Sequence, residues 1–170
     1  ARDPGTERMV RIAALIRSGA MAFLKVEYTV LAVFVAVMFV VLALFLPANG
    51  LQTAISFLVG AGLSALAGFV GMRTATTAAV RTTQAARTSL AGALTVAFSS
   101  GAVMGLTVVA LGTLGIAALY YVYDGLAGGG ALAAEYLFGF SLGASSIALF
   151  ARVGGGIFTK AADVAGDLSG

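Results

Sequence analysis

The sequence predicts an all-α protein, a polytopic transmembrane helix bundle with about four spanning helices in this chain. Hydrophobic residues make up 60% of the sequence and charged residues only 10%, against about 25% charged residues in ordinary soluble domains. The mean hydropathy is +1.03. The apolar residues also form long blocks rather than the half-faces of amphipathic helices, and this pattern indicates lipid as the surrounding solvent.

The composition excludes several kinds of chemistry within these residues. The sequence contains no cysteine, histidine or tryptophan. Disulfides, zinc sites, thiol nucleophiles and histidine-based acid–base catalysis are therefore excluded within this chain. The net charge is +3, and the basic residues lie in the junctions between apolar blocks. In a membrane protein this pattern indicates topology rather than nucleic-acid binding, so we expect no nucleic-acid partner.

The first element is expected to be an interfacial helix over residues 1–27 that leads directly into a first span. Asp3 and Pro4 offer an N-cap followed by proline at the first helical position. Apolar residues then recur at helical spacing among basic ones. The span itself is expected at about 28–46, and residues 47–50 form a turn rich in turn-forming residues. Residues 28–170 are predicted to form part of one transmembrane domain.

The second span is expected at about 51–72, with a stripe of small residues along one side. Gly60, Ser64 and Gly68 repeat at intervals of four residues, and small residues allow another helix to approach closely in lipid. The following segment, 73–87, places arginines among Ala and Thr. It contains neither Gly nor Pro, so it is compatible with a continuing helix.

The third span is expected at about 90–122. Residues 88–123 contain no charge, and this stretch is longer than the about 20 residues that cross a bilayer. It carries a further small-residue pair, Gly101 and Gly105. Three tyrosines near its end suit an aromatic belt at the membrane interface: Tyr120, Tyr121 and Tyr123.

The fourth span is expected at about 131–157, after a loop formed by Asp124-Gly125 and Gly128-Gly129-Gly130, and it continues as a cytoplasmic extension to residue 170. Basic residues occur at the N-terminal end, in 73–87 and at the C-terminal end, whereas the two other junctions have none. The positive-inside rule then places both termini of this chain on the cytoplasmic side.

Four charged residues near the C-terminal end share one face of the expected helix. Arg152, Lys160, Asp163 and Asp167 fall within an arc about 80° wide at about 100° per residue. One interpretation is a solvated helix end with ordinary surface neighbours. The other is a binding site, because two carboxylates one turn apart repel each other unless a cation lies between them. The three glycines Gly154-Gly155-Gly156 also weaken the helix just before Lys160. A weakened helix at this position suggests that another segment packs closely against the glycines.

The charged face suits a magnesium–phosphate ligand. Mg²⁺ takes oxygen ligands, often one or two protein carboxylates together with substrate phosphates. A lysine contacts phosphate as a point charge. The segment is not a Walker A loop, because Ala161 follows the lysine and the glycines are contiguous.

This C-terminal segment resembles that of a known family, the membrane-bound ion-translocating inorganic pyrophosphatases. The stretch GGGIFTKAAD at 154–163, with Asp167 after it, is similar to the signature of that family. Four other segments are similar to it in the same order: residues 20–24, 81–87, 100–105 and 138–152. The resemblance therefore covers nearly the whole chain, as the N-terminal portion of the family sequence.

The resemblance implies a large homodimeric pump of many helices, in a prokaryotic cell inner membrane. Such a pump hydrolyses inorganic pyrophosphate with Mg²⁺ on the cytoplasmic side and moves H⁺ or Na⁺ across the membrane; a need for K⁺ is left open. By matching positions, Lys160, Asp163 and Asp167 bind substrate, Asp163 and Asp167 also bind Mg²⁺, and Arg152 lies in the ion pathway. No catalytic residue is assigned in this chain, since the water-activating acids lie elsewhere in the family sequence.

Some positions depart from the family pattern, and other classes of protein remain as alternatives. Ala165 and Gly166 stand in the opposite order to the commonest pattern, and Ser99 replaces a larger residue. The chain corresponds to about four of roughly sixteen family helices, so we expect a fragment that is inactive alone. The alternatives are a secondary transporter or channel subunit without hydrolytic activity, whose charged stripe binds an ion or anionic solute, and a purely structural membrane subunit.

Overall fold

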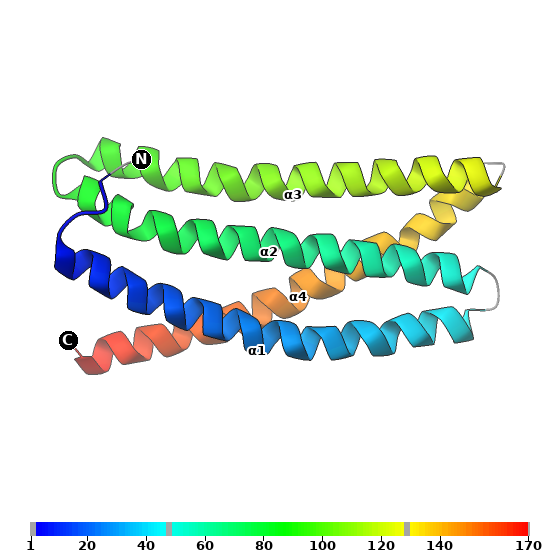
Figure 1. Ribbon diagram of the computed structural model, residues 1–170, viewed down its shortest axis with the longest axis horizontal. Helices are drawn as coiled ribbons and strands as arrows, with labels where there is room; N and C mark the ends of the chain where they lie inside the picture. Colours follow the sequence, from blue (N-terminus) through cyan, green and yellow to red (C-terminus); the bar gives the residue numbers. More distant parts are fainter. Residues whose placement is uncertain (1–2, 47–48, 128–129, 170) are drawn as a thin grey trace. The chain divides into compact units, whose positions relative to one another are not determined.

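The computed structural model describes residues 3–46, 49–127 and 130–169. Four long helices account for nearly all of these residues (Figure 1): α1 Glu7–Phe45, α2 Gly50–Ala86, α3 Leu90–Ala127 and α4 Gly130–Ser169. No strand occurs in the described ranges. The predicted all-α class is therefore confirmed.

All four helices are long and apolar enough to cross a membrane. They contain between 37 and 40 residues, which corresponds to about 55–60 Å at 1.5 Å per residue. The hydrocarbon core of a bilayer is only about 30 Å thick. Each helix can therefore span the core and still extend beyond it, and this agrees with four predicted spans that have polar extensions.

The first helix starts later than the sequence predicted. Asp3 does not cap α1: its Oδ1 accepts a hydrogen bond from the backbone N–H of Gly5 at 2.9 Å, and Gly5 has a φ of 89°, outside the helical range. Thr6 takes the capping position, because its Oγ1 accepts a bond from the N–H of Met9 at 3.4 Å. The expected N-cap at Asp3 with helical Pro4 is therefore wrong, since the backbone turns at Gly5 first.

The connections between helices are shorter than predicted. The second helix passes through Arg73 without a break and ends at Ala86. The third helix continues to Ala127, so Asp124 and Gly125 are helical rather than part of a loop. Gly130 already belongs to α4. Of the other residues assigned to turns, Pro47, Ala48, Gly128 and Gly129 lie outside the described residues, as does Gly170 at the end of the expected extension.

The chain divides into two compact units, each built from parts of several helices. Unit 1 comprises residues 1–25 and 66–110, and unit 2 comprises residues 26–65 and 111–170. In unit 1, Gly71 of α2 faces the side chain of Met104 on α3. The Nε2 of Gln84 donates to Oδ2 of Asp3 at 3.2 Å, which ties the N-terminal segment to the end of α2.

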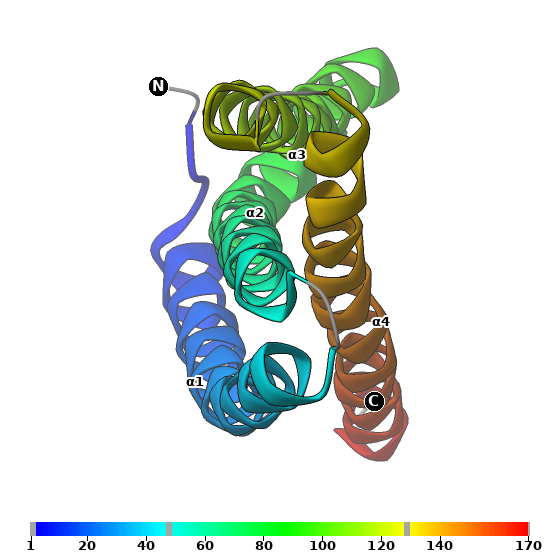
Figure 2. The ribbon, with the colours of Figure 1, turned by 90° about the vertical axis from the view of Figure 1, so that its right-hand side faces the viewer.

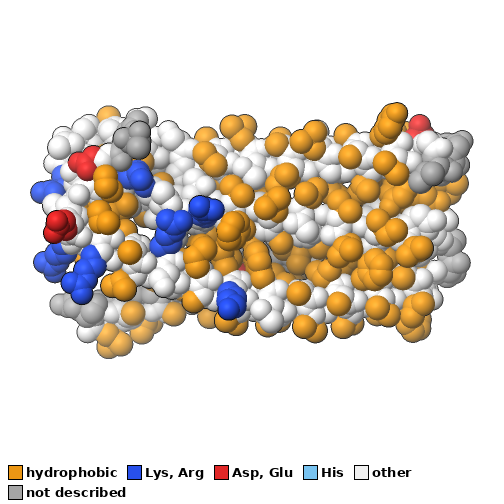
Figure 3. Space-filling model, in the orientation of Figure 1, with side chains coloured by type: hydrophobic (Ala, Val, Ile, Leu, Met, Phe, Trp, Pro, Cys, Tyr) orange, Lys and Arg blue, Asp and Glu red, His pale blue; other side chains and the backbone are white. Residues whose placement is uncertain are grey.

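Unit 1 carries most of the positive charge. Its described residues include seven basic side chains and two acidic ones. Figure 3 shows the visible Lys and Arg side chains gathered over the first half of α1 and the second half of α2. The stretches 28–65 and 125–134 of unit 2 contain no charged residue at all. Unit 1 thus has the composition of a membrane boundary, where basic side chains reach the headgroups.

Unit 2 is held together by a close seam between the first half of α2 and the first half of α4. The two helices are neighbours in Figure 2, and in Figure 1 α4 passes behind α2 at an angle. A Cβ added at Gly60 of α2 would meet the backbone carbonyl of Phe140. Cβ atoms added at Gly139 or Gly143 of α4 would meet the carbonyls of Thr53 and Phe57. Because these glycines have no side chain, the backbones of α2 and α4 can lie in direct contact. The predicted close approach of a helix at Gly60 is confirmed.

One predicted member of the aromatic belt is instead a buried link between helices. Tyr123 is only 5% exposed. Its hydroxyl donates to the carbonyl of Gln52 at 3.0 Å and accepts a bond from Ser56 Oγ at 3.1 Å. The ring also packs edge-on against Tyr136 of α4, with 5.1 Å between centroids. The belt assignment is wrong for Tyr123, because its buried hydroxyl has partners on α2, whereas Tyr121 is 83% exposed.

Candidate functional site

All four charged residues singled out by the sequence lie on the second half of α4, and all are exposed. The structure brings two of them together: Lys160 Nζ lies 3.4 Å from Asp163 Oδ2. These side chains are 82% and 65% exposed, so the pair contributes little to stability. Arg152 and Asp167 take part in no salt bridge within the described residues. The charged face thus presents both signs of charge to its surroundings.

The first half of α4 is anchored firmly, in contrast to its end. Ser64 Oγ of α2 donates to the carbonyl of Ala144 at 3.1 Å. Ile147 is buried against Leu31 of α1, and the rings of Phe34 and Phe150 meet edge-on at 4.9 Å between centroids. Residues 159–168 are all exposed. The site residues therefore project from a helix whose position is fixed elsewhere in unit 2.

The packing expected around Gly154-Gly155-Gly156 is not made at Gly155 or Gly156 by the described part of this chain. Cβ atoms added at Gly155 or Gly156 would meet no atom within 4 Å. The helix nevertheless continues through all three glycines. Their small size leaves the backbone accessible immediately before the charged face.

Several residues that position the site were missed by sequence reasoning. Gly139 and Gly143 hold α4 against α2, and their four-residue spacing is the same signal that identified Gly60 and Ser64. The buried role of Tyr123 carried no such signal, because a tyrosine near a span end also suits the interface.

The two aspartates near the end of α4 have the right chemistry to bind a magnesium ion, but they are too few to complete its coordination. Asp163 and Asp167 offer exposed carboxylate oxygens one helical turn apart, and Mg²⁺ prefers oxygen ligands. Within the described ranges, no group of three or more His, Cys, Asp or Glu side chains could hold a metal ion. These two carboxylates could therefore supply part of a metal site, with the remaining ligands from substrate, water or other protein segments.

The long apolar helices, the basic boundary and the relatives of this sequence together define an integral membrane protein. A family model described as "Inorganic H+ pyrophosphatase" matches residues 1–170. The chain therefore belongs to the inorganic H⁺ pyrophosphatase family, and the resemblance predicted from residues 154–167 is confirmed.

Individual relatives give the same result and show how much of the family sequence is represented. A relative from Clostridium tetani is 55% identical over 166 residues, which are 98% of this chain and 23% of the relative. A K⁺-insensitive pyrophosphate-energized proton pump of Moorella thermoacetica is 48% identical over 99% of this chain and 24% of its own length. A K⁺-stimulated pyrophosphate-energized sodium pump of Thermotoga maritima is 41% identical over 99% of this chain and 25% of its own length. The chain thus spans about a quarter of these curated relatives.

Proposed function

We propose that this chain supplies one helix of the substrate site, and part of the ion pathway, of a pyrophosphate-energised ion pump. The observation that carries the proposal is the exposed face of Lys160, Asp163 and Asp167 on a helix anchored to α2, in a chain of the pyrophosphatase family. The pump hydrolyses Mg-pyrophosphate on the cytoplasmic side and translocates H⁺ or Na⁺. The named relatives include both proton and sodium pumps.

The charged face of α4 has the groups that this substrate needs. Lys160 exchanges its contact with Asp163 for a phosphate oxygen of pyrophosphate, and a point charge suits this role. Asp163 and Asp167 would hold Mg²⁺ together with substrate oxygens. When bound, Mg²⁺ neutralises phosphate charge and so favours attack by water. The acids that orient this water belong to segments outside this chain, so residues 1–170 alone do not turn over substrate.

The same proposal specifies the membrane orientation and the partners of this chain. Basic residues at both ends and near residues 73–87 favour a cytoplasmic position for both termini of this chain. The partners are the lipid bilayer, the remaining helices of the same pump and a second copy of it, in a prokaryotic cell inner membrane. K⁺ is a further cation to consider, since the names of the relatives include K⁺-stimulated and K⁺-insensitive pumps.

Hydrolysis by the purified full-length protein tests this function against the alternative of a secondary transporter or channel. We expect Mg²⁺-dependent release of phosphate from pyrophosphate, which stops when Mg²⁺ is chelated. A transporter that binds an anionic solute at the same face would show no release. Transport of a solute without any phosphate release would favour that alternative.

Arg152 is proposed to link the phosphate site to the ion pathway. It lies eight residues before Lys160 on α4, about 12 Å away along the helix axis, and it follows the uncharged stretch 136–151. A guanidinium at this depth is costly unless it reaches the headgroups or pairs with an anion. A planar guanidinium can bind a carboxylate through two parallel hydrogen bonds, whereas a lysine ammonium cannot.

We therefore expect Arg152→Lys in the full-length protein to reduce ion pumping by at least about tenfold, and hydrolysis by no more than pumping. Both rates are measured in the same proteoliposomes. Arg17→Lys, at an exposed position of α1, serves as the control and should leave both rates unchanged. Unchanged pumping in Arg152→Lys would show that this residue only anchors α4 at the membrane boundary, because lysine also reaches the headgroups.

A further inference from the structure

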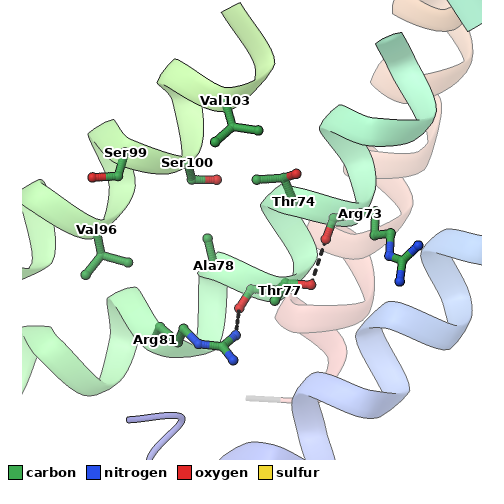
Figure 4. Close-up of a pocket in the computed structure, with 9 residues that line it drawn as sticks. All are labelled: Arg73, Thr74, Thr77, Ala78, Arg81, Val96, Ser99, Ser100 and Val103. Atoms are coloured by element: carbon green, nitrogen blue, oxygen red, sulfur yellow. Dashed lines mark hydrogen bonds between the residues drawn. The ribbon is translucent and has the colours of Figure 1, made fainter. Parts of the chain in front are cut away.

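A cavity of about 430 Å³ lies within unit 1, between the second half of α2 and the first half of α3. Figure 4 shows its lining. The α2 residues are Arg73, Thr74, Thr77, Ala78 and Arg81, and the α3 residues are Val96, Ser99, Ser100 and Val103. It is separate from the charged face of α4, which belongs to unit 2.

The lining combines positive charge, hydroxyl groups and apolar side chains. Arg81 and Val96 lie at one end and Thr74, Ser100 and Val103 at the other, as Figure 4 shows. Arg81 donates to the carbonyl of Thr77 at 2.6 Å, and this bond holds the guanidinium beside α2. Arg73 also lines the cavity, beside Thr74, so arginines occur at both ends together with hydroxyl groups and apolar side chains. This lining matches an amphiphile that has an anionic head.

Two of the four hydroxyl groups in the lining make no hydrogen bond within the described residues, and one of these two faces the cavity. Thr77 Oγ1 donates to the carbonyl of Arg73 at 2.7 Å, and Ser99 Oγ donates to the carbonyl of Thr95 at 2.6 Å. Thr74 and Ser100 make no side-chain hydrogen bond within the described part of the chain. In Figure 4 the hydroxyl of Ser100 points across the cavity toward α2, whereas Thr74 turns its methyl group toward Ser100. The Ser100 hydroxyl can therefore donate to an ester or phosphate oxygen.

The position of the cavity selects a lipid over a soluble anion. Arg73 is the charged residue that borders the uncharged stretch 51–72, so the cavity lies where α2 passes from apolar to basic sequence. Next to it on α3, Phe98 and Leu106 are 75% and 70% exposed, which offers apolar surface to acyl chains. Unit 1 has an excess of five positive charges among its described residues, and this excess favours an anionic headgroup over a zwitterionic one.

We propose that this cavity binds the phosphodiester headgroup of an anionic glycerophospholipid. The phosphate lies at the Arg81 end, where a guanidinium can donate two parallel bonds to it. A glycerol ester accepts from Ser100, and the acyl chains follow the apolar surface of α3. The proposal requires only that the chain is an integral membrane protein, so it stands independently of pyrophosphate hydrolysis.

Native mass spectrometry of the delipidated full-length protein in detergent, titrated with phosphatidylglycerol or phosphatidylcholine, tests the proposal. We expect phosphatidylglycerol to bind at least about tenfold more tightly than phosphatidylcholine. Arg81→Gln and the double variant Thr74→Val with Ser100→Ala should each remove most of this difference, and Arg81→Lys should restore part of it. Arg11→Gln, an exposed unit 1 residue outside the lining, and Thr95→Val, which also lies outside it, are matched controls and should bind as the wild type does.

Three results would overturn the proposal. Equal binding of the two lipids would remove the headgroup preference. An equal loss in Arg11→Gln and Arg81→Gln would indicate diffuse attraction to the basic surface rather than a site. Displacement of phosphatidylglycerol by millimolar inorganic phosphate, with loss of phosphate binding in Arg81→Gln, would assign the cavity to a free anion instead. The double hydroxyl variant keeps the test valid if Arg81→Gln fails to fold, because its side chains preserve size and add no charge.

Discussion

Asp163→Asn and Asp167→Asn, each made in the full-length protein, are expected to reduce Mg²⁺-dependent pyrophosphate hydrolysis at least about 100-fold. Each change keeps the size of the side chain and removes the negative charge that would hold Mg²⁺ beside the substrate. Both residues are exposed on the last turns of α4, so the fold and membrane insertion should persist. The measurement is the initial rate of phosphate release over a range of Mg²⁺ concentrations.

Asp124→Asn is the matched control for these two variants. Asp124 is also an exposed carboxylate in a helix, but it lies near the end of α3, far along the chain from the charged face. Its hydrolysis rate should equal that of the wild type. Near-normal hydrolysis rates in both Asp163→Asn and Asp167→Asn would support the simpler interpretation, in which the charged face is only a solvated helix end.

Gly60→Ala is expected to have the largest effect on stability. The added methyl group would meet the backbone carbonyl of Phe140 on α4, and backbone cannot yield as the tip of a side chain can. The two helices must then separate, with a loss of unfolding free energy of at least about 2 kcal/mol. The measurement is the midpoint of unfolding in mild detergent as the denaturing detergent fraction increases.

Gly62→Ala provides the same substitution two residues away on the same helix. A Cβ at Gly62 meets no described atom within 4 Å, so this variant should keep or slightly raise stability, because alanine favours the helix over glycine. A similar loss in both variants would show that helix propensity or local backbone, rather than the contact with α4, determines the effect. An unchanged midpoint in Gly60→Ala would show that the close contact between α2 and α4 does not determine stability.

The helical class and the small-residue contacts were predictable because they depend on local pattern. Long apolar blocks require helices in lipid, and the four-residue spacing that includes Gly60 and Ser64 identified the side of α2 on which α4 packs. The helix ends were less predictable. The start of α1 depends on the backbone conformation at Gly5, and the end of α3 depends on how well helix formation tolerates Gly125, which spacing alone does not reveal.

The charged face of α4 was predictable from the sequence, whereas its role as a binding site stays a prediction. Lys160, Asp163 and Asp167 were identified because helical periodicity alone places them on one face. The buried position of Tyr123 and the cavity beside Ser100 arise where separate helices meet, and contacts of this kind depend on tertiary packing that one sequence does not encode by spacing. Within the described residues, no third acidic side chain joins Asp163 and Asp167 in a group that could hold a metal ion.

The most direct test of the central claim is ion transport by the full-length protein in sealed proteoliposomes, started by adding pyrophosphate with Mg²⁺ to the outside. Uptake is followed with a pH-sensitive dye for H⁺ and with ²²Na for Na⁺, while phosphate release is measured in the same sample. We expect that one of the two ions accumulates, that accumulation and phosphate release start together, and that Asp163→Asn abolishes both. Phosphate release without accumulation of either ion, in vesicles shown to be tight, would contradict the assignment of this chain to an ion pump.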